Sequence, residues 1–166
     1  MKRFLVVVLG VLVASYFWLA FIGVEPQDRR PGTKLSGSET PIPADWSVLD
    51  DVAEVHLETR PWFGIPFSVT VVAAAVGDSV FVPSIYDSPM QFPGSKYWNT
   101  VVAANPNVRL RVHDKLYSMQ IVAPASPAEV TANLEVLASK YDFWRDKLSI
   151  APDERSFTVL QLQPAS

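Results

Sequence analysis

The sequence predicts an α+β fold: a six-stranded antiparallel β-barrel with flanking helices, preceded by one N-terminal transmembrane helix. Three observations support this prediction. An uninterrupted apolar run occupies residues 4–24, six later segments have the short apolar patterns of β-strands, and few segments have helical patterns. Closure into a barrel is expected because it removes the exposed edges of a sheet. The length of 166 residues suits a single domain of ordinary size.

Residues 4–24 are expected to form an uncleaved membrane anchor. No charged residue interrupts the run, and at 1.5 Å per residue it spans roughly 30 Å, the thickness of a bilayer's hydrocarbon core. The alternative is a cleaved signal peptide, but such segments are shorter and end in a small-x-small site, which Leu19 to Gly23 match poorly. Basic residues flank both ends of the run. A single span with a short basic head favours a cytoplasmic N-terminus and an outward-facing domain.

Residues 25–45 are predicted to be a linker, because Pro, Gly, Ser and Thr are frequent and no apolar period is present. Arg29 and Arg30 could rest on anionic lipid head groups, and a solvated spacer is the alternative interpretation. The chain thus divides into an anchor at 1–24, this linker, and a folded barrel domain at 46–166.

The first half of the folded domain contains three expected strands. A helical turn capped by Asp45 opens it. Residues 54–59 alternate polar and apolar side chains, which is typical of a half-buried strand. Residues 67–76 are nearly all apolar and rich in β-branched residues, as in a strand buried on both faces. After a Gly-Asp turn, residues 80–84 return as the third strand.

The second half is expected to hold two helices and three strands. Residues 96–104 form a short helix that an Asn-Pro pair ends. Alternating patterns predict a hairpin of strands at 108–112 and 116–122 and a last strand at 156–163. Ser-Pro-Ala-Glu at 126–129 is a capping-box sequence, so we expect the second helix to begin there.

The composition excludes several kinds of site. The absence of cysteine excludes disulfides, zinc–thiolate sites and iron–sulfur clusters, and two histidines are too few for a multi-histidine metal site. We therefore expect no metal. The formal net charge of −3 argues against nucleic acid as a partner. Neither a nucleophile elbow, a phosphate-binding P-loop, a dinucleotide fingerprint nor a zinc-protease motif is present.

Charged residues on the expected strands have simple interpretations. Glu54 and Glu58 share one strand face, which we expect to face solvent. His56 lies on that face as well, as a surface or hydrogen-bonded histidine. Arg109 and Arg111 project from one face of another strand, where they could bind a polyanion or simply point into water.

Two cations near loops suggest an anion site. Lys96 opens a helix beside a Gly-Ser pair, where free amide groups and the helix dipole favour a phosphate. A solvated lysine is the alternative. Arg60 lies where a strand ends and a loop begins. Aromatic residues near these positions could line a pocket for a flat ring, plug the barrel or form a dimer contact. They are Trp62, Phe63, Tyr86, Phe92, Tyr97 and Trp98.

Four segments follow a recognisable pattern: VHLET (55–59), PFSVTVV (66–72), FVPS (81–84) and KYWNTVVAANPNVRLRV (96–112). The most specific part lies in the last of these segments. It is a lysine or tryptophan, then an asparagine and an apolar pair, and then A-N-P-x-V. Through these segments, residues 53–144 resemble the flavin-binding split-barrel superfamily. Within it they look like the deazaflavin-dependent nitroreductase-like and pyridoxamine 5′-phosphate oxidase-like groups.

The resemblance implies a six-stranded split barrel, usually a homodimer, with a cofactor bound near the dimer interface. In such proteins the end of the third strand and the start of the next helix contact the cofactor phosphate. Carried over, these positions are Ser84 and Lys96, with Trp98 and Asn99 nearby and Arg60 at the end of the first strand. The deazaflavin group has a basic, glycine-rich stretch after that strand, where this chain has RPWFGIPF.

The sequence therefore favours a membrane-anchored oxidoreductase that depends on FMN or a deazaflavin cofactor. Such a cofactor carries the hydride or electrons itself, so no acid–base motif is needed. A membrane tether would suit a lipophilic electron acceptor such as a quinone. The alternative is a non-catalytic, membrane-tethered binding or accessory module that has lost the cofactor. Haem binding by a similar barrel is a third interpretation, which the shortage of histidines disfavours.

Overall fold

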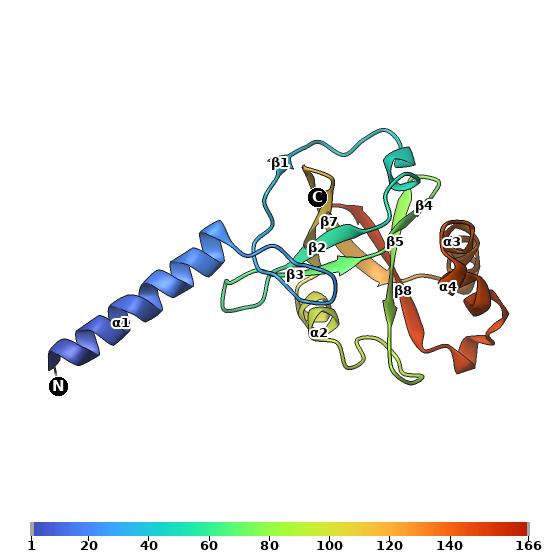
Figure 1. The fold of residues 1–166 in the computed structure, drawn as a ribbon. Coiled ribbons are helices and arrows are strands. Elements are labelled where there is room, and N and C mark those ends of the chain that lie inside the picture. Colours follow the sequence, from blue (N-terminus) through green and yellow to red (C-terminus); the bar gives the residue numbers. More distant parts are fainter. Residues whose placement is uncertain (1, 166) are drawn as a thin grey trace.

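The computed structural model describes residues 2–165, and Figure 1 shows a long N-terminal helix projecting from a single β-rich domain. Among the described residues, the domain is built from strands with three α-helices and three single helical turns around them. The strands are β1 (Ser38–Glu39), β2 (Val55–Thr59), β3 (Phe67–Val71), β4 (Ala74–Val76), β5 (Ser79–Ile85), β6 (Asn107–Val112), β7 (Lys115–Pro124) and β8 (Phe157–Pro164). The α-helices are α1 (Lys2–Phe17), α2 (Tyr97–Ala104), α3 (Pro127–Lys140) and α4 (Asp142–Arg145). Single turns occupy Ser47–Leu49, Asp146–Ser149 and Pro152–Glu154.

The sheet has the strand order β3-β2-β6-β7-β8-β5-β4, and each of these neighbours is antiparallel. The two strands at the ends of this order, β3 and β4, are separated in sequence by only Val72 and Ala73. One chain segment thus supplies both ends of the sheet. The sheet must curl back on itself for that to happen, which is the topology of a barrel.

The expected α+β class, antiparallel sheet and flanking helices are confirmed, but the sheet has eight strands where the sequence predicted six. Residues 67–76, predicted as one strand, form two because each half pairs with a different neighbour. Val71 pairs with Val55 of β2, whereas Ala74 pairs with Phe81 of β5. The other additional strand, β1, pairs in parallel with β7.

The domain interior is divided between the two sides of the sheet. Strand residues such as Leu57, Leu110 and Leu160 fill the main core, and α3 packs a second cluster around Phe81 and Leu137. The predicted capping box at the start of α3 is confirmed. The Ser126 hydroxyl accepts from the Glu129 amide at 3.4 Å, and the Ser126 amide donates to the Glu129 carboxylate at 2.8 Å. The helix therefore begins at the predicted position.

The N-terminal helix stands apart from the domain (Figure 1). Helix α1 continues through a wider turn at Trp18–Ile22. Arg3–Ile22 is long and apolar enough to cross a membrane, with a mean hydropathy of 2.6, and none of it is buried against the domain. The apolar helix expected from the sequence is present.

Residues 25–40, called the strap from here on, lie across the sheet, whereas the sequence predicted a linker for 25–45. Gly32 and Ser68 of β3 exchange backbone hydrogen bonds of 2.8 and 3.1 Å, and the strap then adds β1 to β7. Leu35, at the centre of the strap, is only 1% exposed. The structure differs from the prediction because one buried leucine and several charge pairs hold this segment, and neither produces an apolar period.

Candidate functional site

A cleft of about 790 Å³ opens between the strap, β3, β5, the start of α2 and helix α4. This volume lies within the range of small-molecule sites in proteins. Four aromatic side chains from α2 and the α3–α4 region line it: Trp98, Tyr141, Phe143 and Trp144. Trp98 and Trp144 are buried, whereas the Phe143 ring is exposed. The cleft thus combines fixed aromatic rings in its wall with one ring open to solvent.

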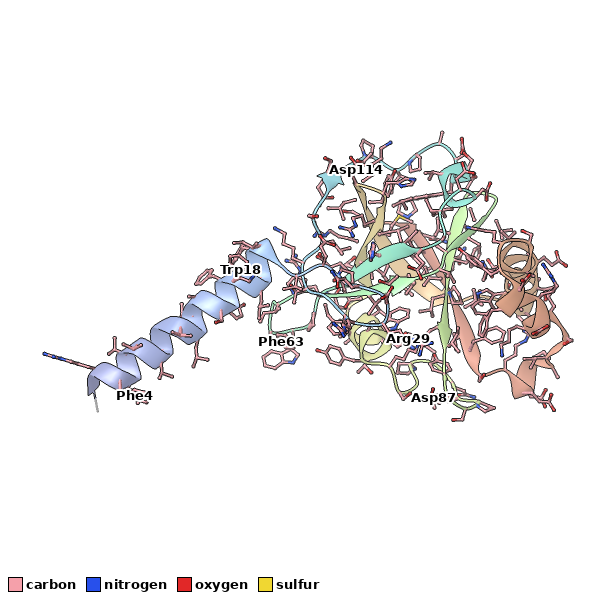
Figure 2. The ribbon with its side chains drawn as sticks, in the orientation of Figure 1. Phe4, Trp18, Arg29, Phe63, Asp87 and Asp114 are labelled. Carbon is pink, nitrogen blue, oxygen red and sulfur yellow. The ribbon has the colours of Figure 1, made fainter. Side chains whose placement is uncertain are left out.

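Three cations, Arg29, Arg30 and Lys96, also line the cleft. Both arginines lie in a tight turn of the strap, closed by hydrogen bonds between Gln27 and Arg30 of 2.8 and 3.1 Å. Within residues 2–165, none of the three cations forms a salt bridge. Figure 2 shows Arg29 and Asp87 on this side of the domain. The positive charges here are available to an anionic ligand.

Lys96 immediately precedes helix α2 and reaches the cleft from the helix N-terminus. Partial burial lowers the pKa of its ammonium group, and the negative charge of Asp87 opposes that shift. The amide groups of the first helical turn have no partners within the helix, and the positive end of the helix dipole lies at the same place. Burial removes part of the water that stabilises the charged ammonium group. An anion bound here would replace that lost stabilisation.

Thr70 of β3 adds an unpaired polar atom to the cleft. Its hydroxyl oxygen is shielded from solvent and has no hydrogen-bond partner among the described residues. An unpaired buried hydroxyl is costly, so most such groups in proteins find a partner.

Ser84 and Asn99, two of the residues expected to bind a cofactor, lie behind the cleft wall and bond to each other. The Asn99 amide donates to the Ser84 hydroxyl at 2.9 Å, to the Tyr86 hydroxyl at 3.2 Å and to the Pro93 carbonyl at 2.8 Å. Pro83 and Ile85 line the cleft, and Ser84 between them points to the opposite face of β5. This pair holds the loop after β5 against α2.

Arg60 lies away from the other four predicted residues. It borders a second, smaller cleft of about 380 Å³, and its guanidinium is 4.0 Å from the Glu58 carboxylate. The structure therefore brings Lys96 and Trp98 together at the first cleft, places Ser84 and Asn99 behind it, and separates Arg60 from them.

Sequence reasoning missed the contribution of the strap and of α4 to the cleft. Arg29 and Arg30 were expected in a solvated spacer or against lipid head groups, and Phe143 and Trp144 were not considered. An Arg-Arg pair followed by Pro-Gly is the one signal in the sequence that could have indicated a turn presenting cations. Its location over β3 depends on the Gly32–Ser68 pairing, which no local pattern predicts.

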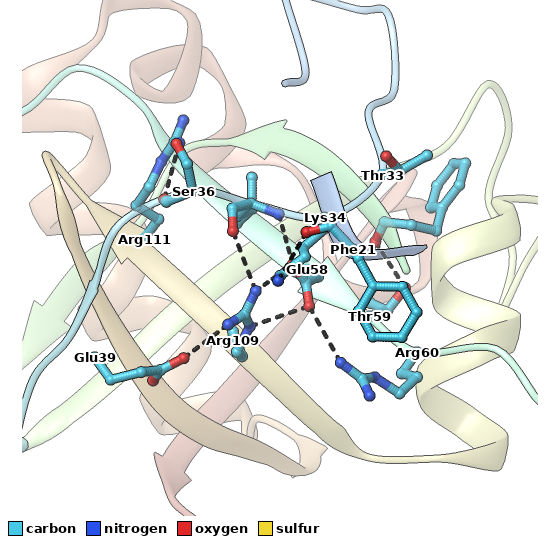
Figure 3. A network of polar contacts seen from close by, with 12 residues as sticks. Phe21, Thr33, Lys34, Ser36, Glu39, Glu58, Thr59, Arg60, Arg109 and Arg111 are labelled. Carbon is cyan, nitrogen blue, oxygen red and sulfur yellow. Dashed lines mark hydrogen bonds and ion pairs between the residues drawn. The ribbon is translucent and has the colours of Figure 1, made fainter. Parts of the chain in front are cut away.

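A second group of charges lies under the strap, and there every charge is paired (Figure 3). Glu58 was expected to face solvent but is only 3% exposed. Arg109 donates to its two oxygens at 2.7 and 3.0 Å, and the Leu35 amide donates to it at 2.6 Å. Arg109 also donates to Glu39 at 2.7 Å. The solvent-facing prediction for Glu58 is wrong because the strap covers this face.

Arg111 is engaged in the same way, by Glu25 at 2.6 Å and by Nδ1 of His56 at 3.0 Å. Burial, and then the charge of Arg111, lower the pKa of His56, against the opposing effect of Glu25 and Glu54. His56 is therefore a hydrogen-bonded histidine, one of the two interpretations of the sequence. Arg109 and Arg111 neither point into water nor lie free to bind a polyanion.

No protein-family model matches this chain, and no curated protein sequence is significantly similar to it. Solved structures are similar. The heme storage protein HutZ from Vibrio cholerae matches with a TM-score of 0.50 and 14% identity, over 72% of this chain and 87% of that one. A candidate 5-nitroimidazole antibiotic resistance protein from Bacteroides thetaiotaomicron matches with a TM-score of 0.50 and 13% identity, over 70% and 75%.

A candidate pyridoxamine 5′-phosphate oxidase from Listeria innocua is also similar, with a TM-score of 0.45, 16% identity, and coverage of 72% of this chain and 90% of that one. The chain has a split-barrel fold. The fold that the sequence resemblance implied is thus confirmed. At these identities the likeness speaks for the fold, and the site must be argued from this chain's own residues.

Proposed function

We propose that this chain is a membrane-anchored oxidoreductase that binds a flavin-type cofactor, FMN or a deazaflavin, in the cleft between the strap and α4. The observation that carries the proposal is the meeting of three cations, which form no salt bridge within residues 2–165, with aromatic side chains in one cleft of a split-barrel fold. Cations suit a phosphate, and aromatic rings suit the flat ring system of a flavin.

The residues at the cleft fit such a cofactor. Arg29, Arg30 and Lys96 would hold its phosphate. Trp98 and Phe143 would flank the ring. When bound, the cofactor supplies hydride or electron transfer, and the chain supplies binding, orientation and the exclusion of water.

We also propose that Arg3–Ile22 anchors the protein in a membrane and that the domain faces outward. The length and hydropathy of this helix support the anchor. A domain held at a bilayer surface is well placed for a lipophilic electron acceptor. A homodimer of the folded domain remains our proposal for the assembly.

A non-catalytic binding or accessory module is the second candidate, and one observation favours it. Asp28, Glu54 and Asp87 line the same cleft and balance its three cations, which weakens the attraction for a phosphate dianion. Haem bound through histidine is not supported at this cleft. His56 is held under the strap by Arg111, and His113 is exposed in the turn between β6 and β7.

Titration of the full-length protein with FMN and with a deazaflavin cofactor tests the proposal. We expect binding of one of them, and a weakening of about 10- to 150-fold in Lys96→Ala, because a charge-assisted hydrogen bond contributes roughly 1.5–3 kcal/mol. Lys115→Ala removes an exposed cation at the first residue of β7, outside the cleft, and is the matched control that should bind as the wild type does. A wild-type protein that binds neither cofactor at tens of micromolar contradicts the oxidoreductase and leaves the accessory module.

A further inference from the structure

We infer that the loop between β2 and β3, residues 60–66, inserts its aromatic tip into the membrane interface beside α1 and forms a second contact with the lipid surface. This inference rests on the proposed membrane anchor. It concerns a different surface from the cleft, and it would fix the orientation of the whole domain on the bilayer.

The loop contacts the last turn of α1, before the wider turn at Trp18–Ile22. The Tyr16 hydroxyl donates to the Phe63 carbonyl oxygen at 3.1 Å. Gly64 allows this approach, because a Cβ atom at that position would lie 2.9 Å from the Tyr16 oxygen. Gly64 also has a φ of +85°, which favours glycine. In Figure 2, Phe63 and Trp18 lie near the same end of the helix.

This contact sets the depth of the loop. Tyr16 precedes Ile22, the end of the apolar helix, by six residues, which corresponds to about 9 Å along the helix axis. Tyr16, Trp18 and Phe21 are the kind of side chains that occupy the membrane–water interface. If the helix spans the bilayer with this aromatic end at the interface, the loop lies at the same level.

The loop presents the side chains that the interface favours. The Trp62 side chain is 96% exposed, and the Phe63 ring is partly exposed and packs edge-to-face on it, with 5.6 Å between ring centroids. Arg60 and Lys34 lie close by; the Lys34 ammonium donates to the Phe21 carbonyl at the helix end at 3.0 Å. Aromatic side chains favour the membrane interface, and cations favour anionic lipid head groups. An aromatic tip followed by cations therefore matches the change from acyl chains to head groups.

The tip is held rigidly, so its exposure is not that of a loose loop. The Gly64 amide donates to the Pro61 carbonyl at 3.1 Å, and the Asn105 side chain donates to the Arg60 carbonyl at 3.1 Å. Pro61 and Pro66 are buried. Because the exposed rings continue the exposed apolar surface of α1, lipid is the occupant that covers both surfaces at once.

Site-directed spin labelling of the full-length protein in phosphatidylcholine vesicles tests the inference directly. The chain has no cysteine, so each variant carries one label at a known place. Trp62→Cys and Phe63→Cys report the loop, and Leu9→Cys reports the helix. Leu148→Cys is the matched control, because it is an exposed apolar residue after α4, on the side of the domain opposite to α1 (Figure 1).

Oxygen, which is enriched in lipid, and a water-soluble nickel complex are used as relaxation agents. We expect the ratio of oxygen to nickel accessibility to rise from position 148 to positions 62 and 63 and again to position 9. Equal ratios at 62, 63 and 148, with a high ratio at 9, overturn this inference while the anchor stands. A low ratio at 9 overturns the anchor and this inference with it. Protection of 62 from both agents, with dipolar broadening between labels, shows that a second copy covers the loop and also overturns it.

Discussion

The two groups of cations on this domain differ in one respect: those under the strap are paired, and those at the cleft are not. Arg109 and Arg111 are held by Glu58, Glu39 and Glu25 at 2.6–2.7 Å. Within residues 2–165, Arg29, Arg30 and Lys96 have no salt-bridge partner. The strap itself joins the groups, since it supplies two of the three acids to one and two of the three cations to the other.

The comparison separates cations that hold the fold from cations that can hold a ligand. A buried arginine with bidentate hydrogen bonds is saturated, and removing its partner leaves an uncompensated charge. Leaving a cleft cation without an acidic partner costs little free energy, and an anion that binds there stabilises it. Mutations on the two sides should therefore affect different quantities: the free energy of unfolding under the strap, and ligand affinity at the cleft.

The largest effect is expected from Glu58→Gln. Glu58 is buried and accepts two hydrogen bonds from Arg109 and one from the Leu35 amide, so the neutral side chain leaves the arginine poorly compensated. We expect a loss of about 3 kcal/mol in the free energy of unfolding, the lower end for a broken buried ion pair, because Arg109 keeps Glu39. Urea unfolding followed by circular dichroism measures it.

Glu39→Gln is the matched control, because Glu39 binds the same arginine at the same distance of 2.7 Å but is 60% exposed. Exposed ion pairs contribute about 0–1 kcal/mol, so this variant should unfold almost as the wild type does. Equal losses in the two variants would show that burial under the strap does not distinguish these pairs.

Removal of the strap should have the next largest effect. A variant that begins at residue 25 keeps the strap, whereas one that begins at residue 46, the predicted domain boundary, lacks it. The second should be less stable by about 2 kcal/mol through the lost burial of Leu35 alone. Both are compared by urea unfolding. Equal stability would mean that residue 46 is the true boundary and that the strap is a linker after all.

The smallest effect is expected from pH, and two groups that the strap covers or contains contribute to it. Burial alone raises the pKa of Glu25, but hydrogen bonds from Ser36 and the charge of Arg111 outweigh it and lower the pKa below 4.5. Burial and Arg111 lower the pKa of His56 below 6.5. In both cases the unfolded chain takes up its proton first, so stability falls as the pH falls.

Glu25 and His56 affect stability in different pH ranges, so substitutions can separate their contributions. His56→Asn should flatten the decline of stability just below pH 6.5, and Glu25→Gln should flatten it below about pH 4.5. Urea midpoints measured from pH 7 to pH 4 provide the comparison. A decline that neither substitution changes would place its origin outside the strap.

Local patterns predicted the elements of the domain well, and failed where distant segments meet. The capping box at Ser126 depends on neighbouring residues only, as does the hydrogen bond that the Asp45 carboxylate accepts from the Ser47 amide at 2.9 Å, although Trp46 and not Asp45 occupies the N-cap position of that turn. The split of residues 67–76 depends on two different partner strands, β2 and β5. An apolar run contains no information about which strand each half will join.

The candidate site was predicted in part for the same reason. Lys96 and Trp98 belong to one helix start, so their shared location follows from the local sequence. Arg29 and Arg30 reach the cleft only because the strap crosses β3. Glu58 was assigned to solvent because alternation shows that a face exists, not what covers it. Charge complementarity between Glu25 or Glu39 and the arginines of β6 was the available signal, and it has no fixed spacing.

The most direct test of the central claim compares the affinity of the full-length protein for FMN with its affinity for riboflavin, which lacks the phosphate. If the unpaired cations of the cleft bind the phosphate, FMN should bind about 10- to 150-fold more tightly than riboflavin, and Lys96→Ala should remove most of that preference. Glu39→Gln, which alters only the paired group, should keep it. Equal affinities for FMN and riboflavin in the wild type would contradict the account.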